Sequence, residues 1–391
     1  MFFYLSFLRP PPSQALPSDS VSITPQVAND LRTELLDNAQ DIYYAWCLPP
    51  APHAKPNQLP AITKPQKLTT WRQGSAYKEL SVPTPPGIRE GQSCCLLLTT
   101  HAQGYPHLIN LGSTDVGQRP YPVMSMPILF CSKNSKGKSP AYSEKQEHVE
   151  RIYRIPLNSS EQVFMRVKEQ TSFDLDKKVW DSGIGLSSWI TTLANDDSIA
   201  SSAGILARMK SAILSPERRS IIELGAGTGM VSLTLGALRS AKAPDDSLLT
   251  TDLASAMPLL EHNISNNASI FRSDASRPRA LTLDWDEPLP PEVSSVQDGF
   301  DVIIMADVTY NTSAFPSLIR TVSDILRLRS SVPPSTPELR KTMLLLGYKE
   351  RDPAERMLWE MMRDIGVRLE KVDERRGAGG DPVEIWIGTV A

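Results

Sequence analysis

The sequence predicts an α/β protein built on a doubly wound, mostly parallel sheet of seven strands that ends in an antiparallel hairpin. Three observations support this fold class. Strand-like and helix-like segments alternate from residue 220 onward. The apolar run Val302-Ile303-Ile304-Met305 is typical of a strand buried on both faces of a parallel sheet. A glycine-rich turn joins the first of these strands to the helix that follows it.

The expected strands are short and apolar, and most are followed by a segment with helical periodicity. They cover 220–224, 247–252, 280–284, 300–306, 342–347, 367–373 and 383–389. The helices between them are expected at 230–238, 256–266, 313–328 and 354–364, and two more, at 184–193 and 203–214, precede the sheet. The last two strands flank the glycine-rich segment Arg375–Asp381, which predicts the terminal hairpin.

Proline distinguishes the first 150 residues from the rest. Nineteen of the 33 prolines precede residue 151, which predicts extended, poorly ordered segments at 1–25 and about 49–66. Between them, apolar side chains at helical spacing predict a helix within Thr24–Tyr44, and Cys94–Thr100 predicts a strand. We therefore expect a proline-rich N-terminal extension over 1–149, partly disordered with some helix and strand, and a separate domain over 150–391.

Composition narrows the function classes. A net charge of −3 gives no overall attraction to nucleic acid or to an anionic membrane, so neither is an expected partner. No apolar run approaches the ~18 residues of a transmembrane helix, and Phe2–Leu8 is too short for a signal peptide. The four cysteines contain no C-x-x-C pair, so no metal site is expected and a cytoplasmic or nuclear location is favoured.

The segment Ile221–Gly229 carries the first chemical signal. Glu223, Gly225, Gly227 and Gly229 alternate with other residues, and Ala226 lies between the first two glycines. Glycine permits positive φ and removes the Cβ, so a ligand can lie against bare backbone. A dinucleotide fingerprint would need a further glycine at Met230 or Ser232, so a dehydrogenase is disfavoured.

Polar or aromatic side chains follow the next strands, where a doubly wound sheet binds its ligand. Asp252 ends the second strand and is suited to accepting hydrogen bonds from ribose hydroxyls, although an aspartate before a helix is often only an N-cap. Asp284 and Trp285 end the third strand, where the indole could cover an adenine ring or simply be buried.

The fourth strand ends in Ala306, followed by Asp307 and Tyr310. A carboxylate and a phenol at this place are predicted to face the reacting group, against the alternative of a helix-initiating aspartate with a packed tyrosine. Upstream, Trp180 precedes small residues at a helix start and could cover the same ligand. The segment Lys349–Asp352 is interpreted as a charged start of a helix.

Together these segments resemble the seven-β-strand (class I) protein-lysine methyltransferases, which have a Rossmann-like fold. The shared features are V-W-D followed by small residues, E-L-G-x-G-x-G, a ribose acid, a D-W pair and D-x-x-Y. The resemblance spans about 150–391 and implies S-adenosyl-L-methionine as cofactor. It implies that the cofactor lies against Trp180, Gly225, Gly227, Asp252, Trp285 and Ala306. It also implies that Asp307 and Tyr310 hold the acceptor amine.

The resemblance further implies a monomeric enzyme that methylates lysine in a protein such as a translation factor or chaperone. Asp307 would orient the amine and Tyr310 would steer its lone pair. One rival is a nucleic-acid amino methyltransferase, but such enzymes carry prolines where this chain has Val308 and Thr309. A small-molecule methyltransferase and a cofactor-binding scaffold without activity also stay open.

Overall fold

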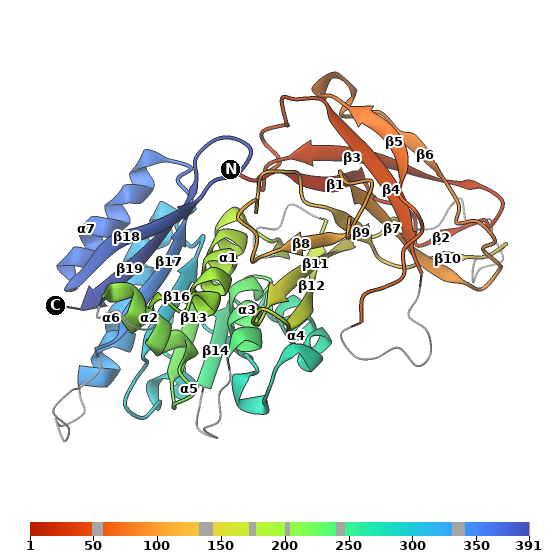
Figure 1. The fold of residues 1–391 in the computed structure, drawn as a ribbon. Coiled ribbons are helices and arrows are strands. Elements are labelled where there is room, and N and C mark those ends of the chain that lie inside the picture. Colours follow the sequence, from red (N-terminus) through yellow and green to blue (C-terminus); the bar gives the residue numbers. More distant parts are fainter. Residues whose placement is uncertain are drawn as a thin grey trace.

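The computed structural model describes residues 1–48, 58–132, 144–171, 177–199, 204–239, 247–330 and 341–390. It consists of a β-rich N-terminal part and a C-terminal α/β part, which lie against each other (Figure 1). Among the described residues, no helix is both long and apolar enough to cross a membrane.

The α/β part contains a sheet of seven strands in the order β15-β14-β13-β16-β17-β19-β18. The first five strands in this order run parallel, and β19 is antiparallel to both β17 and β18. The order reverses between β13 and β16, which is where doubly wound sheets bind ligands. The strand bounds are β13 Ser220–Leu224, β14 Ser247–Asp252, β15 Arg279–Thr282, β16 Val302–Ala306, β17 Met343–Tyr348, β18 Val367–Arg375 and β19 Val383–Val390.

Helices cover both faces of this sheet because its strands are apolar on both faces. Ile221 and Ile222, neighbours in β13, belong to different hydrophobic clusters. One cluster includes side chains of α1 Asp181–Asn195, α2 Ile205–Leu214, α3 Met230–Leu238 and α4 Met257–Asn266. The other includes side chains of α5 Pro291–Ser294, α6 Phe315–Ser330 and α7 Met357–Asp364. This arrangement confirms the predicted doubly wound fold with its terminal hairpin.

The N-terminal part forms two sheets, not a poorly ordered extension. One sheet has the order β1-β3-β6, and the other has the path β12-β11-β9-β7-β10-β2 with β4, β5 and β8 attached. The strands are β1 Tyr4–Arg9, β2 Gln14–Ala15, β3 Ser20–Ala28, β4 Gln40–Cys47, β5 Gln66–Trp71, β6 Leu80–Pro83, β7 Ser93–Thr99, β8 Leu108–Asn110, β9 Val123–Ser125, β10 Ile128–Phe130, β11 His148–Pro156 and β12 Gln162–Gln170.

Two predictions for this part are therefore wrong. Residues 1–25 are not poorly ordered, because β1 and β3 pair with each other and enclose buried side chains such as Leu5 and Ile23. No helix forms within Thr24–Tyr44, since β3 ends at Ala28 and β4 begins at Gln40. Of the segment expected to be extended at 49–66, residues 49–57 lie outside the described residues.

Pro25 shows why proline misled the prediction. It lies inside β3, opposite Phe7, where the register with β1 shifts. A proline lacks the N–H that a regular ladder needs, so a strand tolerates it best at such an irregularity. Proline-rich sequence is therefore compatible with ordered strands here.

The two parts share a strand hairpin and a hydrophobic cluster. Strands β11 and β12 form a hairpin that pairs with β9 and β8 of the N-terminal sheet, although it begins next to residue 150. Phe2 and Tyr4 belong to the same hydrophobic cluster as β13, α1 and α3. The chain start also lies beside the turn between β18 and β19 (Figure 1). There the Met1 amino group donates to the carbonyl oxygen of Asp381 (2.5 Å).

Candidate functional site

A cleft of about 270 Å³ lies at the carboxyl ends of β13, β14 and β16, beside the starts of α1 and α3. All the residues that the sequence singled out for the site line it, except Gly229. The lining includes Trp180, Glu223, Gly225, Ala226, Gly227, Asp252, Asp284, Trp285, Ala306, Asp307 and Tyr310. Parallel strands place their carboxyl ends at one edge of a sheet, which explains why residues as far apart as Glu223 and Asp307 meet here.

The glycine turn forms the floor of this cleft. Gly225, Gly227 and Gly229 have φ of +67°, +54° and +80°, values that side chains other than glycine rarely adopt. A Cβ on Gly225 would lie 3.0 Å from Cγ1 of Val308 and 3.4 Å from the Trp285 ring. Gly229 lies behind the cleft as the N-cap of α3, against Leu260.

Glu223 is buried beneath the turn, and its carboxylate is hydrogen-bonded to neighbouring residues of the protein. Its Oε2 accepts hydrogen bonds from the Ser232 backbone N–H (3.1 Å), the Ser232 hydroxyl and the Thr250 hydroxyl (3.3 Å). Burial raises the pKa of Glu223 to about 7, because the hydrogen bonds from Ser232 and Thr250 offset it only in part. These contacts tie β13, α3 and β14 together, so Glu223 supports the shape of the turn.

Asp252 braces the turn from the neighbouring strand. Its Oδ2 accepts a hydrogen bond from the Gly227 N–H (2.6 Å), and its Oδ1 accepts one from the Leu253 N–H (2.7 Å). The N-cap of the following helix is Ala256, so the alternative of Asp252 as a helix cap does not hold. Carboxylate oxygens are also suitable acceptors for hydroxyl groups.

Two indoles lie on the walls of the cleft. Trp180 is the N-cap residue of α1, and the guanidinium carbon of Arg351 lies 5.3 Å from its ring centroid. The Trp285 ring is half-buried, and its backbone carbonyl accepts from the Arg320 guanidinium (2.7 Å). Asp284 is exposed and accepts from the Asp286 N–H (2.9 Å). Aromatic walls with carboxylates at the rim suit a flat heterocycle that carries polar groups.

Asp307 is buried at the end of β16 with φ of +61°. Its carboxylate forms a two-pronged ion pair with Arg351, in which Nη2 lies 2.9 Å from Oδ2, and it also accepts from the Ser182 N–H (3.3 Å). Tyr310 is 55% exposed. The alternative of a helix-initiating aspartate with a packed tyrosine is therefore wrong: Asn311, not Asp307, caps the next helix.

Lys349 and Arg351 are the residues that the sequence interpretation missed. The segment does lead into a short helix, which Asp352 caps, but Lys349 is buried and Arg351 nearly so, both against carboxylates from three other segments. Lys349 Nζ lies 3.1 Å from Asp30 Oδ1 and 2.8 Å from Asp181 Oδ2. A lysine and an arginine two positions apart, directly after β17, keep the alternation of a strand, and this was the signal available in the sequence.

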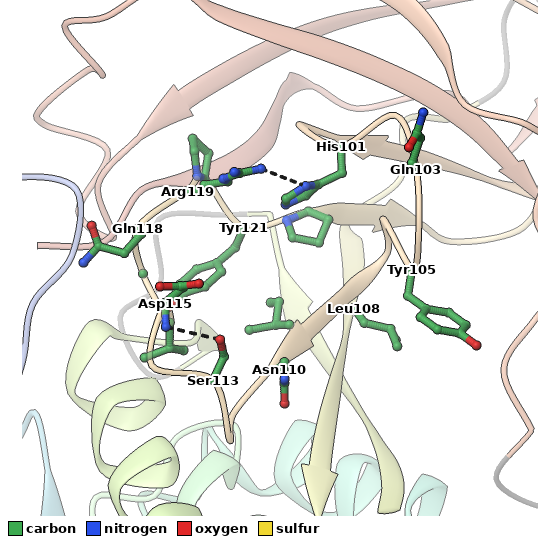
Figure 2. A pocket seen from close by; sticks show the side chains of 15 residues that line it. His101, Gln103, Tyr105, Leu108, Asn110, Ser113, Asp115, Gln118, Arg119 and Tyr121 are labelled. Atoms are coloured by element: carbon green, nitrogen blue, oxygen red, sulfur yellow. Dashed lines mark hydrogen bonds between the residues drawn. The ribbon is translucent and has the colours of Figure 1, made fainter.

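A larger cavity of about 760 Å³ lies in the N-terminal part, within residues 101–122 (Figure 2). Its labelled side chains are mostly polar, and Nη1 of Arg119 lies 3.2 Å from Nδ1 of His101. Because it is built from a single stretch of chain and lies away from the strand ends of the α/β sheet, we assign the functional site to the smaller cleft.

The C-terminal part of the chain matches a known protein family. The model of a family described as lysine methyltransferase matches residues 159–364, which include α1, the glycine turn and the ends of β14 and β16. The chain belongs to the lysine methyltransferase family. The methyl donor of this family is S-adenosylmethionine.

The protein-lysine N-methyltransferase EFM6 of Saccharomyces cerevisiae is 28% identical over 151 residues, which cover 37% of this chain and 55% of EFM6. The protein N-lysine methyltransferase METTL21A of Danio rerio is 29% identical over 159 residues, covering 40% and 62%. The chain thus spans less than two thirds of these relatives. A structure of magnesium protoporphyrin IX methyltransferase from Synechocystis with bound S-adenosylmethionine covers 52% of this chain and 84% of its own at 11% identity and a TM-score of 0.31, too low to bear on function.

The residues of the cleft fit this methyl donor. Gly225 and Gly227 have no side chain, so a nucleoside can approach their backbone closely. A Cβ at Gly225 would instead crowd Val308 and Trp285. Asp252 places a carboxylate in the cleft, a group suited to accepting hydrogen bonds from hydroxyls, and Trp180 and Trp285 provide apolar walls.

Proposed function

We propose that this protein is an S-adenosylmethionine-dependent protein-lysine N-methyltransferase. The observation that carries the proposal is the single cleft that unites the glycine turn, Asp252, Trp285 and Asp307 at the reversal point of the sheet. Membership of the lysine methyltransferase family supports the same reaction. EFM6 and METTL21A, similar to the C-terminal part, are named as methyltransferases of protein lysine.

The donor supplies an activated methyl group on a sulfonium sulfur. In the transfer, the S–CH₃ bond breaks, an N–CH₃ bond forms on the lysine amine, and sulfur keeps the electron pair. This chain would hold the ribose hydroxyls at Asp252, cover the adenine with Trp285 near Asp284, and line the remaining donor with Trp180, Ala226 and Ala306. Glu223 would act from below by fixing the turn.

Asp307 would orient the acceptor amine. A carboxylate has about four acceptor positions, and Arg351 and Ser182 use three of those on Asp307. The position left on Oδ1 suits one N–H of a neutral lysine. Because Arg351 balances its charge, Asp307 favours the ammonium form of the substrate less than an unpaired carboxylate would. Tyr310, at the exposed rim of the cleft, would direct the amine lone pair inward.

Two energy terms set what the site must supply. A lysine with an ordinary pKa of ~10.4 costs about 4–5 kcal/mol to deprotonate at pH 7. Correct alignment of two reactants contributes ~7–11 kcal/mol in well-oriented systems. Fixed side chains at the base of the cleft serve the second requirement, and the positive sulfonium of the donor would lower the first by lowering the pKa of the nearby amine.

Nucleic-acid or small-molecule amines are the second class of acceptor. The sequence between Asp307 and Tyr310 lacks the prolines of the nucleic-acid enzymes, and no feature of the cleft favours such a substrate. We further propose a monomer that acts in the cytoplasm or nucleus on a protein such as a translation factor or chaperone. We also propose a domain division at 1–149 and 150–391. The hairpin of β11 and β12 follows this boundary in sequence but pairs with the N-terminal sheet.

The test is the variant Asp307→Asn, which keeps the shape of the side chain. We expect methyl incorporation from labelled donor into proteins of a heat-treated lysate to fall at least about 100-fold, because amine orientation is lost. Calorimetry should still detect S-adenosylhomocysteine binding. Asp324 on α6, which is partly exposed and paired with Arg327 outside the cleft, gives the matched control Asp324→Asn, which should retain activity. Full activity of Asp307→Asn would refute the assignment.

A further inference from the structure

Asp307 belongs to a cluster of charged side chains that are almost entirely buried. It consists of three carboxylates and two cations: Asp30, Asp181, Asp307, Lys349 and Arg351. Their side chains are between 0% and 11% exposed. Four of the five come from the α/β part, and Asp30 alone comes from the N-terminal β part, directly after β3.

Asp30 uses both carboxylate oxygens toward the α/β part. Its Oδ1 accepts from Lys349 Nζ (3.1 Å), and its Oδ2 accepts from Arg351 Nη2 (2.9 Å) and from the Asp181 N–H (3.3 Å). Lys349 and Arg351 outweigh the opposing effect of burial and hold the pKa of Asp30 below its ordinary value. Asp30 is therefore ionised at neutral pH.

Arg351 connects Asp30 with Asp307. The nitrogen Nη2 that donates to Asp30 also donates to Asp307 Oδ2 (2.9 Å), and Nη1 donates to Asp307 Oδ1. A planar guanidinium has its donors in a fixed fork, so a contact on one side sets the direction of the others. The position of Asp30 thus fixes the plane in which Arg351 meets the carboxylate of Asp307.

The loop that carries Asp30 is itself rigid. Oδ1 of Asn29 accepts hydrogen bonds from the N–H groups of Thr33 (3.0 Å) and Glu34 (3.2 Å), which closes the turn after β3. The Arg32 guanidinium donates to the carbonyl of Thr171 (3.1 Å), which anchors the turn to the end of β12. A loop held at both ends delivers Asp30 to one place, as a positioning residue requires.

We propose that Asp30, from the N-terminal β part, is a positioning residue of the methyl-transfer site that orients the Asp307 carboxylate through Arg351. The proposal rests on the proposed function, because Asp307 must contact the acceptor amine. It gives the N-terminal part a direct role in the reaction: without Asp30, Arg351 loses one of its two carboxylate partners and Asp307 loses its fixed orientation.

The experiment compares Asp30→Asn, which removes the charge, and Asp30→Glu, which keeps it on a chain one methylene longer. Tritiated S-adenosylmethionine and a heat-treated lysate serve as substrates, at a temperature well below each variant's Tm. We expect the maximum rate to fall about 10- to 100-fold in Asp30→Asn and at least threefold in Asp30→Glu. The half-saturating lysate concentration and the Kd for S-adenosylhomocysteine should change less than threefold.

The matched control is Asp37→Asn in the same loop, because the exposed Asp37 accepts a hydrogen bond from the Gln73 side-chain amide (2.8 Å) and lies outside the cluster. It should keep the wild-type rate. A folded Asp30 variant of either kind with the wild-type maximum rate overturns the proposal, as does a loss of activity that follows lost S-adenosylhomocysteine affinity. A wild-type protein that neither binds S-adenosylhomocysteine nor transfers methyl groups refutes the proposed function itself.

Discussion

Asp307 combines two unusual features at the scale of a single residue. It is a residue other than glycine with a positive φ, +61°, and its buried carboxylate accepts hydrogen bonds from Arg351 on both oxygens. Aspartate tolerates the left-handed region better than most residues, but the conformation still costs of order 1 kcal/mol or more. Strain of this kind persists where the surroundings force it, and here the ion pair and the Ser182 N–H do so.

The buried carboxyl of Glu223 predicts how the stability of the protein changes with pH. Its pKa is raised to about 7 in the folded protein and is ordinary when unfolded. An acid whose pKa is higher in the folded state than in the unfolded state stabilises the fold fully at pH values below its unfolded pKa. This contribution is lost as the pH rises toward the folded pKa of about 7. We expect wild-type stability to fall between pH 4.5 and 7 by up to about 3 kcal/mol more than that of Glu223→Gln, whose amide does not titrate.

Urea unfolding of both proteins at several pH values checks this difference. Only the difference between the two proteins matters, because other groups titrate equally in both. Parallel pH profiles for wild type and Glu223→Gln would show that the carboxyl of Glu223 is not held in its neutral form.

At the scale of the elements, the sequence predicts well where local pattern and burial agree. The bounds of β13, α3 and β14 are those predicted, because an apolar run, three glycines and a helical repeat follow one another without conflict. The prediction fails at Thr24–Tyr44, where helical spacing of apolar residues is accidental. There the pairing of β3 with β1 and β6 decides the structure, and a local pattern contains no information on such partners.

The glycine turn predicts how a substitution in it changes ligand binding. Gly225→Ala should weaken S-adenosylhomocysteine binding at least about tenfold, because its Cβ would meet Val308 and Trp285 at the floor of the cleft. Calorimetry measures the change.

The matched control is Gly366→Ala at the turn before β18. It has a similar φ of +81°, but a Cβ there meets nothing within 4 Å. Both variants should lose about 1–2 kcal/mol of stability through the left-handed backbone. Equal Kd values for Gly225→Ala and wild type would mean that the ligand does not lie against this turn.

For the whole molecule, the important feature is a hydrophobic cluster that both parts share. Phe2 and Tyr4 pack in the cluster that also covers β13, so the N-terminal part is not a separate appendage. The Tyr4 hydroxyl donates to Asp181 Oδ1 (2.7 Å), and the Phe2 N–H donates to Asp181 Oδ2 (2.8 Å). Burial, and secondarily the charge of Asp30, raises the pKa of Asp181 to about 6.

Such a core predicts one cooperative thermal transition, with equal calorimetric and van't Hoff enthalpies. Tyr4→Phe should lower the Tm of this one transition, since losing a hydrogen bond to a buried carboxylate costs about 1.5–3 kcal/mol. Tyr77, which is 77% exposed, provides the control Tyr77→Phe with an unchanged Tm. Two separate transitions in the wild-type protein would contradict the shared core.

The sequence by itself determined the α/β sheet, the glycine turn and the carboxylates at the strand ends, because each depends on residues close together along the chain. Only the tertiary structure decided that the N-terminal part is a pair of sheets and that Lys349 and Arg351 are buried cations. Their partner Asp30 lies 319 and 321 positions away. Contacts over such separations arise from how whole sheets pack, and no local pattern encodes them.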